Sequence, residues 1–207
     1  MLLLGAYVAL PWLAPAFMRL GWTRPAEIIY AFYSTQCHQL SQRSYFLFGP
    51  KAMYSAPELQ DLAGVAPNVP ALRNFIGSPG LGWKVAWSDR MVSLYTSIFF
   101  FGLLARVLRR RIAPLSIWAF ILFALPMAID GGTHFLSDLA GLGLGFRDQN
   151  AWLASLTGNL MPTSFYAGDA LGSFNSWMRL LTGALFGLGV AWTAFPHLDR
   201  ALSPAES

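Results

Sequence analysis

Four long apolar runs constrain the fold of this chain more than any other feature of its sequence. They cover residues 2–20, 92–108, 115–130 and 179–196. A helix needs about 20 apolar residues to cross the hydrocarbon core of a bilayer, and flanking residues can lengthen the two shorter runs. Only 12% of the residues are charged, about half the share found in soluble domains. The sequence therefore predicts an all-α protein, a polytopic transmembrane helix bundle with about four spans.

Two long connections separate these spans. Residues 21–91 form the first connection and residues 131–178 form the second, within a single integral membrane domain that covers residues 1–207. We expect short extramembrane helices in these connections, one near residues 57–62 within a loop rich in proline, glycine and alanine, and an amphipathic turn near residues 152–156. The first span begins without a basic region before it, which favours a retained span over a cleaved signal peptide.

The arginines predict the orientation of the bundle. Twelve of the 14 basic residues are arginine, and three of them lie in the short turn 109–114. Short loops rich in arginine face the cytoplasm, so this turn and both termini are predicted to be cytoplasmic, in a prokaryotic inner membrane. Both long connections then lie on the outer side. The formal net charge of +4 gives no sign of nucleic-acid binding, and the expected partner is the lipid bilayer.

Cys37 and His38 form the most informative polar stretch, in the first connection just outside the bilayer. Thiolate and imidazole are good ligands for zinc, copper or iron. Ile29, Tyr33 and Cys37 recur every four residues, which predicts one face of a helix that ends at Gly49-Pro50. The alternative is that Cys37 packs as a small apolar group. A single cysteine excludes an intramolecular disulfide.

Asp130 and His134 form a second polar pair at the end of the third apolar run. A carboxylate near the edge of the hydrocarbon is costly and by default indicates a function. If the helix continues, the two residues lie four apart on one face, a spacing that suits a shared metal or a carboxylate that orients an imidazole. The alternative is that an arginine such as Arg90 clamps Asp130 in a bidentate, purely structural pair.

The remaining polar motifs lie at the ends of the second and fourth runs. Under the predicted topology every polar motif gathers at the outer face, which predicts one convergent site roofed by the two connections. Small residues at Gly183 and Gly187 predict helix packing. The candidate metal ligands are Cys37, His38, Asp130 and His134, and the supporting polar residues are Gln39, Arg43, Asp89, Arg90, Tyr95, Asn175 and Arg179.

These motifs together resemble a known family. They are Cys37-His38-Gln39, Arg43-Ser44 with Phe46 to Gly49, Arg90 with Tyr95, Pro126-x-x-x-Asp130-Gly131, and Asn175-x-x-x-Arg179-x-x-Thr182-Gly183. In this order and spacing, across about residues 30–195, the chain resembles a widespread prokaryotic family of predicted membrane proteins of unknown function. The resemblance implies a small polytopic membrane protein and no established activity.

The chain departs from that family pattern at two places. The family has a Cys-x-Arg-Cys box where this chain has Ser88-Asp89-Arg90-Met91, and it tends to have glutamine in place of His134. A family site of Cys-His with two further cysteines would resemble a zinc or iron–sulfur site, which this chain cannot build. A harder site from Cys37, His38, Asp130 and His134 stays open, with Asp89 as a further oxygen ligand.

Two functional hypotheses follow. The first is an outer-face site that binds a transition metal such as zinc or takes part in redox chemistry. The second is a non-catalytic accessory subunit of a larger membrane complex, which the eight tryptophans, 16 phenylalanines and lost cysteine box favour. A transporter ranks last, because the sequence has no inverted repeat. Nucleotide-binding loops, nucleophile elbows and metalloprotease motifs are absent from the sequence, so no reaction is assigned.

Overall fold

Four long helices dominate the computed structural model, which describes residues 1–108 and 113–202. They are α1 (Leu2–Arg19), α5 (Asp89–Leu108), α6 (Ile117–Asp138) and α10 (Phe174–Leu202). Each is long and apolar enough to cross a membrane, α10 over Phe174–Leu198. Large apolar side chains on these helices are exposed, as a lipid-facing surface requires. The all-α fold class and the four spans are therefore confirmed.

The spans extend beyond their apolar runs at their outer ends. α6 continues past Asp130 to Asp138, within the extension over residues 131–139 that the sequence allows, and α5 begins at Asp89, one residue before the expected extension over residues 90–91. α10 begins at Phe174 instead of residue 179, so the polar residues at these ends belong to the helices themselves. Pro196 lies inside α10 and does not end it, because membrane helices tolerate proline where neighbours satisfy the freed carbonyl.

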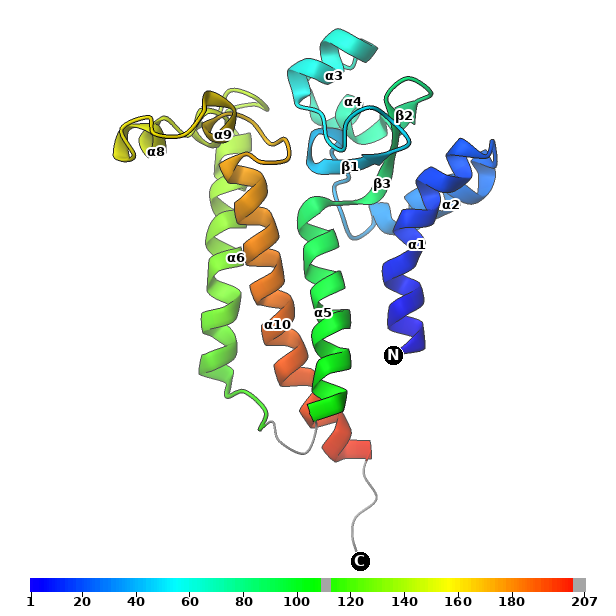
Figure 1. The fold of residues 1–207 in the computed structure, drawn as a ribbon, viewed down its shortest axis with the longest axis vertical. Coiled ribbons are helices and arrows are strands. Elements are labelled where there is room, and N and C mark those ends of the chain that lie inside the picture. The colour runs from blue at the N-terminus through cyan, green and yellow to red at the C-terminus, as the bar shows by residue number, and fades with distance from the viewer. Residues whose placement is uncertain (109–112, 203–207) are drawn as a thin grey trace, which may run out of the picture.

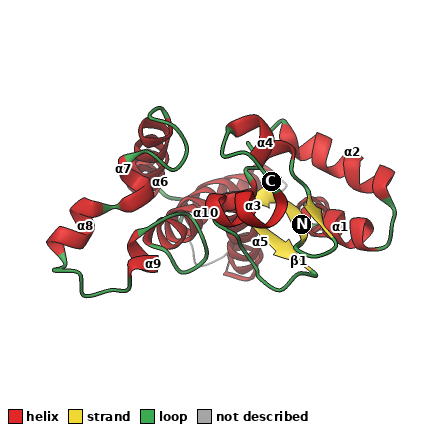
Figure 2. Ribbon diagram, turned by 90° about the horizontal axis from the view of Figure 1, so that it is seen from above, coloured by secondary structure: helices red, strands yellow, loops and turns green. Residues whose placement is uncertain are grey.

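Both connections lie at one end of the bundle, and the start of α1 lies toward the other end (Figure 1). The second connection holds α7 (Phe146–Gln149), α8 (Ala151–Leu156) and α9 (Thr163–Tyr166). Seen from above, these helices extend on the side of α6, while the first connection covers α1 and α5 (Figure 2). The predicted orientation rests on a turn that includes Arg109, Arg110 and Arg111, which lie outside the described residues, so it stays a prediction.

The first connection contains a small sheet that the sequence did not predict. It begins with α2 (Thr23–Ser34) and the 3-10 turn η1 (Ser41–Arg43), and it continues through β1 (Ser44–Leu47), α3 (Ala56–Ala63), α4 (Val69–Asn74), β2 (Gly77–Ser78) and β3 (Gly82–Ser88). The strands are antiparallel in the order β1-β3-β2. β3 is buried along its whole length and leads directly into α5, so the sheet fixes the outer end of that span.

The prediction of one long helix through Cys37 to Gly49 is wrong. α2 ends at Ser34, and Gln39 adopts a positive φ of 50°, which ends regular helix in an L-residue. The chain then turns through η1 into β1, because β3 offers backbone hydrogen bonds to that segment. Cys37 still packs in the same buried cluster as Ile29 and Tyr33, although it reaches that cluster from a loop.

Helices α5 and α10 pack through glycine, as the sequence predicted. A Cβ at Gly183 would lie 3.0 Å from the carbonyl oxygen of Arg90, and one at Gly187 would lie 2.6 Å from that of Leu94. The two backbones therefore approach more closely than any side chain would permit. This contact places Arg179, one turn before Gly183, beside the first turn of α5.

Replacing Gly187 by alanine should separate these helices. We expect Gly187→Ala to lower the free energy of unfolding by about 1–3 kcal/mol, the usual cost of overpacking, and thermal unfolding in detergent measures it. The matched control is Gly132→Ala in α6, where a Cβ meets nothing within 4 Å. Equal melting temperatures for the two variants would contradict the packing argument.

Candidate functional site

Eight charged side chains gather where the two connections cover the spans. All are largely buried, with side-chain exposures between 0% and 24%, and every arginine is bonded to at least one aspartate. They are Arg43, Arg90, Arg147 and Arg179, with Asp89, Asp130, Asp138 and Asp169. Four positive and four negative charges balance, so the loss of hydration is offset by direct pairing.

Asp169, in the second connection, joins both connections to the spans. Its Oδ2 accepts a hydrogen bond from Arg43 Nε at 2.7 Å, and its Oδ1 accepts one from Arg179 Nη1 at 2.6 Å. Arg43 also donates from Nη1 and Nη2 to Asp138, each at 2.8 Å. Arg179 Nε donates to both oxygens of Asp89 at 2.8 Å. A line of alternating charges thus links α6, both connections, α10 and α5.

The pairing determines the charge of the groups outside the spans. Burial raises the pKa of Asp169, but Arg43 and Arg179 outweigh this effect and hold the pKa well below its ordinary value. Burial lowers the pKa of Arg43, but the carboxylates of Asp169 and Asp138 outweigh it and raise the pKa above its ordinary value. Both groups are therefore charged at neutral pH.

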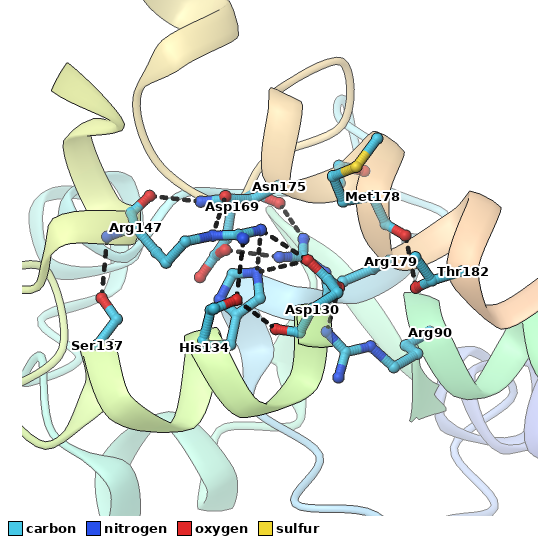
Figure 3. Close-up of polar contacts among 12 residues, drawn as sticks. Arg90, Asp130, His134, Ser137, Arg147, Asp169, Asn175, Met178, Arg179 and Thr182 are labelled. Carbon is cyan, nitrogen blue, oxygen red and sulfur yellow. Dashed lines mark hydrogen bonds and ion pairs between the residues drawn. The ribbon is translucent and has the colours of Figure 1, made fainter. Parts of the chain in front are cut away.

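Asp130 lies between two arginines at the outer end of α6 (Figure 3). Its Oδ2 accepts from Arg90 Nη2 at 2.6 Å, and its Oδ1 accepts from Arg147 Nη2 at 2.7 Å. The predicted pairing of Arg90 with Asp130 is confirmed, but it uses one hydrogen bond and is not bidentate. Arg147 is held in turn by Asn175, whose Oδ1 accepts from Arg147 Nε at 3.1 Å. Both carboxylate oxygens of Asp130 are thus engaged.

A cavity of about 270 Å³ lies beside this network. The first connection, α5, α6 and α10 all contribute to its walls. Its polar lining includes Cys37, His38, His134, Arg43, Arg90 and Arg179. Three of the four candidate metal ligands therefore line one cavity, whereas Asp130 is not part of the lining. A Cβ at Gly131, which also lines the cavity, would lie 2.9 Å from Arg90 Nη1, so glycine makes room for the guanidinium.

The sulfur of Cys37 and the imidazole of His38 already accept hydrogen bonds from the backbone. Cys37 Sγ accepts from the N–H groups of Gln39 and Ser88, both at 3.4 Å. His38 Nδ1 accepts from the N–H of Leu40 at 3.3 Å. The bond to His38 occupies its unprotonated nitrogen, whereas a thiolate of Cys37 would keep one lone pair beyond the two N–H groups that it accepts. Cys37 is also buried among apolar side chains, as expected for a packing cysteine.

His134 is buried on α6, four residues after Asp130, as predicted. Its Nε2 lies 3.2 Å from Arg147 Nη2. Arginine only donates hydrogen bonds, so Nε2 is the acceptor and the neutral ring carries its proton on Nδ1. Nδ1 is buried and has no hydrogen-bond partner among the described residues, and the same holds for Arg90 Nε. Two donors from residues that line the cavity therefore lack acceptors.

The other predicted residues support the site from further away. Asp89 holds Arg179, and Asn175 holds Arg147. Gln39 Nε2 donates to the carbonyls of Tyr30 and Ala86 and so fixes the loop that carries Cys37. Tyr95 stacks on Trp87 with ring centroids 4.7 Å apart, within the aromatic core of the first connection.

The sequence patterns did not indicate three charged residues of the site. Arg147, Asp138 and Asp169 lie in or beside the second connection, where no helical periodicity singled them out. The one available signal was that buried arginines need carboxylate partners, and three aspartates lie in that part of the sequence, at positions 138, 148 and 169.

Within residues 1–108 and 113–202, no group of three His, Cys, Asp or Glu side chains is placed to hold a metal ion.

The part of the chain that contributes most of this site, residues 80–168, is similar to known proteins. Residues 80–168 match a family of predicted membrane proteins, DUF2085. The resemblance inferred from the motifs is thereby confirmed, and the candidate spans agree with a family described as membrane proteins. The uncharacterized protein MJ1492 of Methanocaldococcus jannaschii is 26% identical over 154 residues, which cover 70% of this chain and 72% of that protein. No solved structure matches the chain.

Lys84, on β3, supports the loop that carries Cys37 and Gln39. Its side chain is fully buried, and Nζ donates to the carbonyls of Gln39 at 2.8 Å and Arg73 at 2.6 Å. Burial lowers the pKa of Lys84 to about 7, because the charged form loses its hydration. The unfolded chain keeps the ordinary pKa of about 10.4, so folding releases a proton between these two values.

Lys84 should therefore make stability rise with pH. Above the folded pKa of about 7, the unfolded state binds more protons than the folded state, and the free energy of unfolding increases with pH. We expect the melting temperature of the wild type to rise relative to Lys84→Met as the pH increases from about 6 to about 9. The control is Lys51→Met, because Lys51 is exposed. A pH-independent difference between wild type and Lys84→Met would contradict the buried, proton-releasing lysine.

Asp169→Asn should disrupt the charge network. The amide keeps the shape of the side chain but leaves Arg43 and Arg179 each with one carboxylate fewer, and we expect a loss of roughly 3 kcal/mol in the free energy of unfolding. The contribution of Asp169 is complete above its unfolded pKa of about 3.9 and is lost only as the pH falls below it. The difference should therefore stay constant between about pH 5 and pH 8 in thermal unfolding. Asp61→Asn, at an exposed position, is the control and should be neutral.

Proposed function

We propose that this protein binds a small oxyanion, a carboxylate or phosphate group, in the cavity at the outer ends of its spans. One observation carries the proposal: Arg90 lines the cavity with a side chain that is 21% exposed, and it uses one of its five N–H groups, for Asp130. An oxyanion in the cavity would accept from the N–H groups that Asp130 leaves unused. A charge-assisted hydrogen bond of this kind contributes about 1.5–3 kcal/mol.

The charge of the cavity lining supports an anionic ligand. Arg43, Arg90 and Arg179 line the cavity beside one carboxylate, Asp138. Both oxygens of Asp138 already accept from Arg43, so this carboxylate does not oppose an incoming anion as strongly as a free one would. Arg90 has the largest unused donor capacity, since one of its five N–H groups is bonded to Asp130. A guanidinium of this kind suits the two oxygens of a carboxylate or phosphate.

A transition-metal site is the second candidate, and one observation favours it. Cys37, His38 and His134 line the same cavity, as the sequence predicted for a site completed by Asp130. Both imidazoles would first have to release a donor, the N–H of Leu40 for His38 and the guanidinium of Arg147 for His134. The N–H···S hydrogen bonds of Cys37 are compatible with a metal-bound thiolate. Zinc or another metal would therefore have to replace the hydrogen bonds of the two histidines, whereas an oxyanion would use N–H groups of Arg90 that have no acceptor among the described residues.

Glycerol phosphate and acetate, as soluble oxyanions, test the first candidate. Either should raise the melting temperature of the detergent-purified protein, because a ligand that binds only the folded state stabilises it. Arg90→Gln should weaken the apparent affinity by about tenfold, the value of one lost charge-assisted hydrogen bond. The matched control is Arg106→Gln, which removes an exposed arginine at the other end of α5.

The outcomes separate the candidates. Equal stabilisation of wild type, Arg90→Gln and Arg106→Gln would mean that the anions stabilise the protein through a non-specific salt effect. The oxyanion proposal would then be wrong. Near-stoichiometric metal in elemental analysis of the wild type, lost in Cys37→Ala and His134→Ala, would favour the metal site. If neither ligand binds and a partner protein co-purifies in mild detergent, the accessory-subunit hypothesis takes precedence.

A further inference from the structure

We infer that residues 149–168 of the second connection, here called the lateral arm, lie on the bilayer surface with their apolar side chains among the lipid head groups. The partner of this surface is the lipid bilayer. The arm does not line the cavity beside Arg90, so the inference is independent of the proposed oxyanion site. It rests on the position, the level and the composition of the arm.

The lateral arm projects sideways from the bundle. Seen from above, α8 lies beyond α6 and α10, on the side away from α1 and α5 (Figure 2). The described parts of the four long helices therefore do not lie beneath α8. Lipid occupies the space beside the spans of a membrane protein, so the surface of the arm that faces the membrane lies over lipid.

Aromatic contacts hold the lateral arm at the level where the spans leave the hydrocarbon. The rings of Trp152 on α8 and Phe165 on α9 have their centroids 5.9 Å and 6.1 Å from that of Phe174, the first residue of α10. The apolar part of α10, Phe174–Leu198, is 25 residues long, about 37 Å of helix. It exceeds the hydrocarbon core of about 30 Å, so its ends reach the head groups. Figure 1 shows α8 at the same level, beside the outer end of α6.

The lateral arm contains no charged side chain. Asp148 and Asp169 flank it, and no Asp, Glu, Lys or Arg occurs between them. By contrast, α3 in the first connection is shorter than the arm and carries both Glu58 and Asp61. Charged residues are the usual cover of a surface that faces water. An uncharged segment of this length at the end of the spans therefore suits a surface that lipid covers.

Large apolar side chains on the lateral arm are exposed. Leu156 on α8 is 76% exposed, and Leu160 in the loop after α8 is 85% exposed. Trp152 lies four residues before Leu156, on the same face of α8, and is half exposed. Contiguous exposed apolar patches mark contacts with membranes or proteins, and tryptophan is enriched where a membrane meets water. Lipid would cover all three side chains.

The lipid-facing surface of α6 is continuous with the lateral arm. Leu139 follows the last residue of α6, and Leu144 and Phe146 lead from there toward the arm. All three side chains are exposed. One apolar surface therefore runs from the span through α7 to α8, as expected for a segment that meets the same bilayer as the span.

The backbone of the lateral arm limits how deeply it enters the membrane. Residues 157–162, between α8 and α9, have no regular helix or strand. Irregular backbone exposed to hydrocarbon would leave N–H and C=O groups without partners. The head-group region contains water that can supply these partners, so the arm belongs in the head-group region and not in the hydrocarbon core.

Spin-label accessibility of the full-length protein in phosphatidylcholine nanodiscs tests this inference. The background variant Cys37→Ala removes the only cysteine, and a nitroxide is attached to Leu160→Cys or Leu156→Cys. Two exposed leucines serve as references: Leu62→Cys on α3, which stands far from the spans in Figure 1, and Leu122→Cys within α6. Oxygen concentrates in lipid and a water-soluble nickel chelate stays in water, so the ratio of their collision rates with the label measures its depth.

We expect the oxygen-to-nickel ratio at Leu160 and Leu156 to exceed that at Leu62 several-fold and to stay below that at Leu122. A ratio equal to that at Leu62 would place the lateral arm in water and overturn the inference. Low collision rates with both reagents would mean that a second copy of the chain or another protein covers the arm, and the inference would also be wrong.

Discussion

The two hydrogen bonds from Arg43 and Arg179 to Asp169 hold the outer half of this protein together. Asp169 belongs to the second connection, Arg43 to the first and Arg179 to the last span. A charge this deeply buried is tolerated only with its partner in place, so each element fixes the position of the other two. The cavity, whose walls come from the first connection and three spans, therefore depends on a single carboxylate that does not line it.

The distribution of donors explains why the charged network leaves a polar cavity beside it. Arg43 and Arg179 use all of their nitrogen atoms for aspartates or a carbonyl, and they serve as fixed walls. Arg90 shares Asp130 with Arg147 and keeps unused N–H groups. Arg147 also determines the tautomer of His134. The same contacts that neutralise Asp130 thus leave Arg90 and His134 with donors that nothing among the described residues accepts.

The sequence predicted those parts of the structure that depend on regular spacing. The four spans follow from apolar runs, a helix-packing face at Gly183 and Gly187 from their spacing, and the relation of Asp130 to His134 from helical periodicity, whereas α5 as the partner of that face was not predicted. The sheet was missed because β1 and β2 are only four and two residues long, too short for an alternating pattern. Arg147 and Asp169 were missed because their charged partners lie 10 to 126 residues away in the chain, and no helical or strand periodicity reports such a pairing.

This separation in sequence has a consequence for biosynthesis. A chain emerges from the ribosome from its N-terminus, so Arg43 is made long before Asp169, and Asp89 precedes Arg179 by 90 residues. Until Asp169 has been made, Arg43 has only Asp138 as a partner, and until Arg179 has been made, Asp89 at the start of α5 lacks its arginine. The outer half of the protein therefore reaches its charge balance only late in synthesis, and a nascent chain stalled before Asp169 carries charges that lack their final partners.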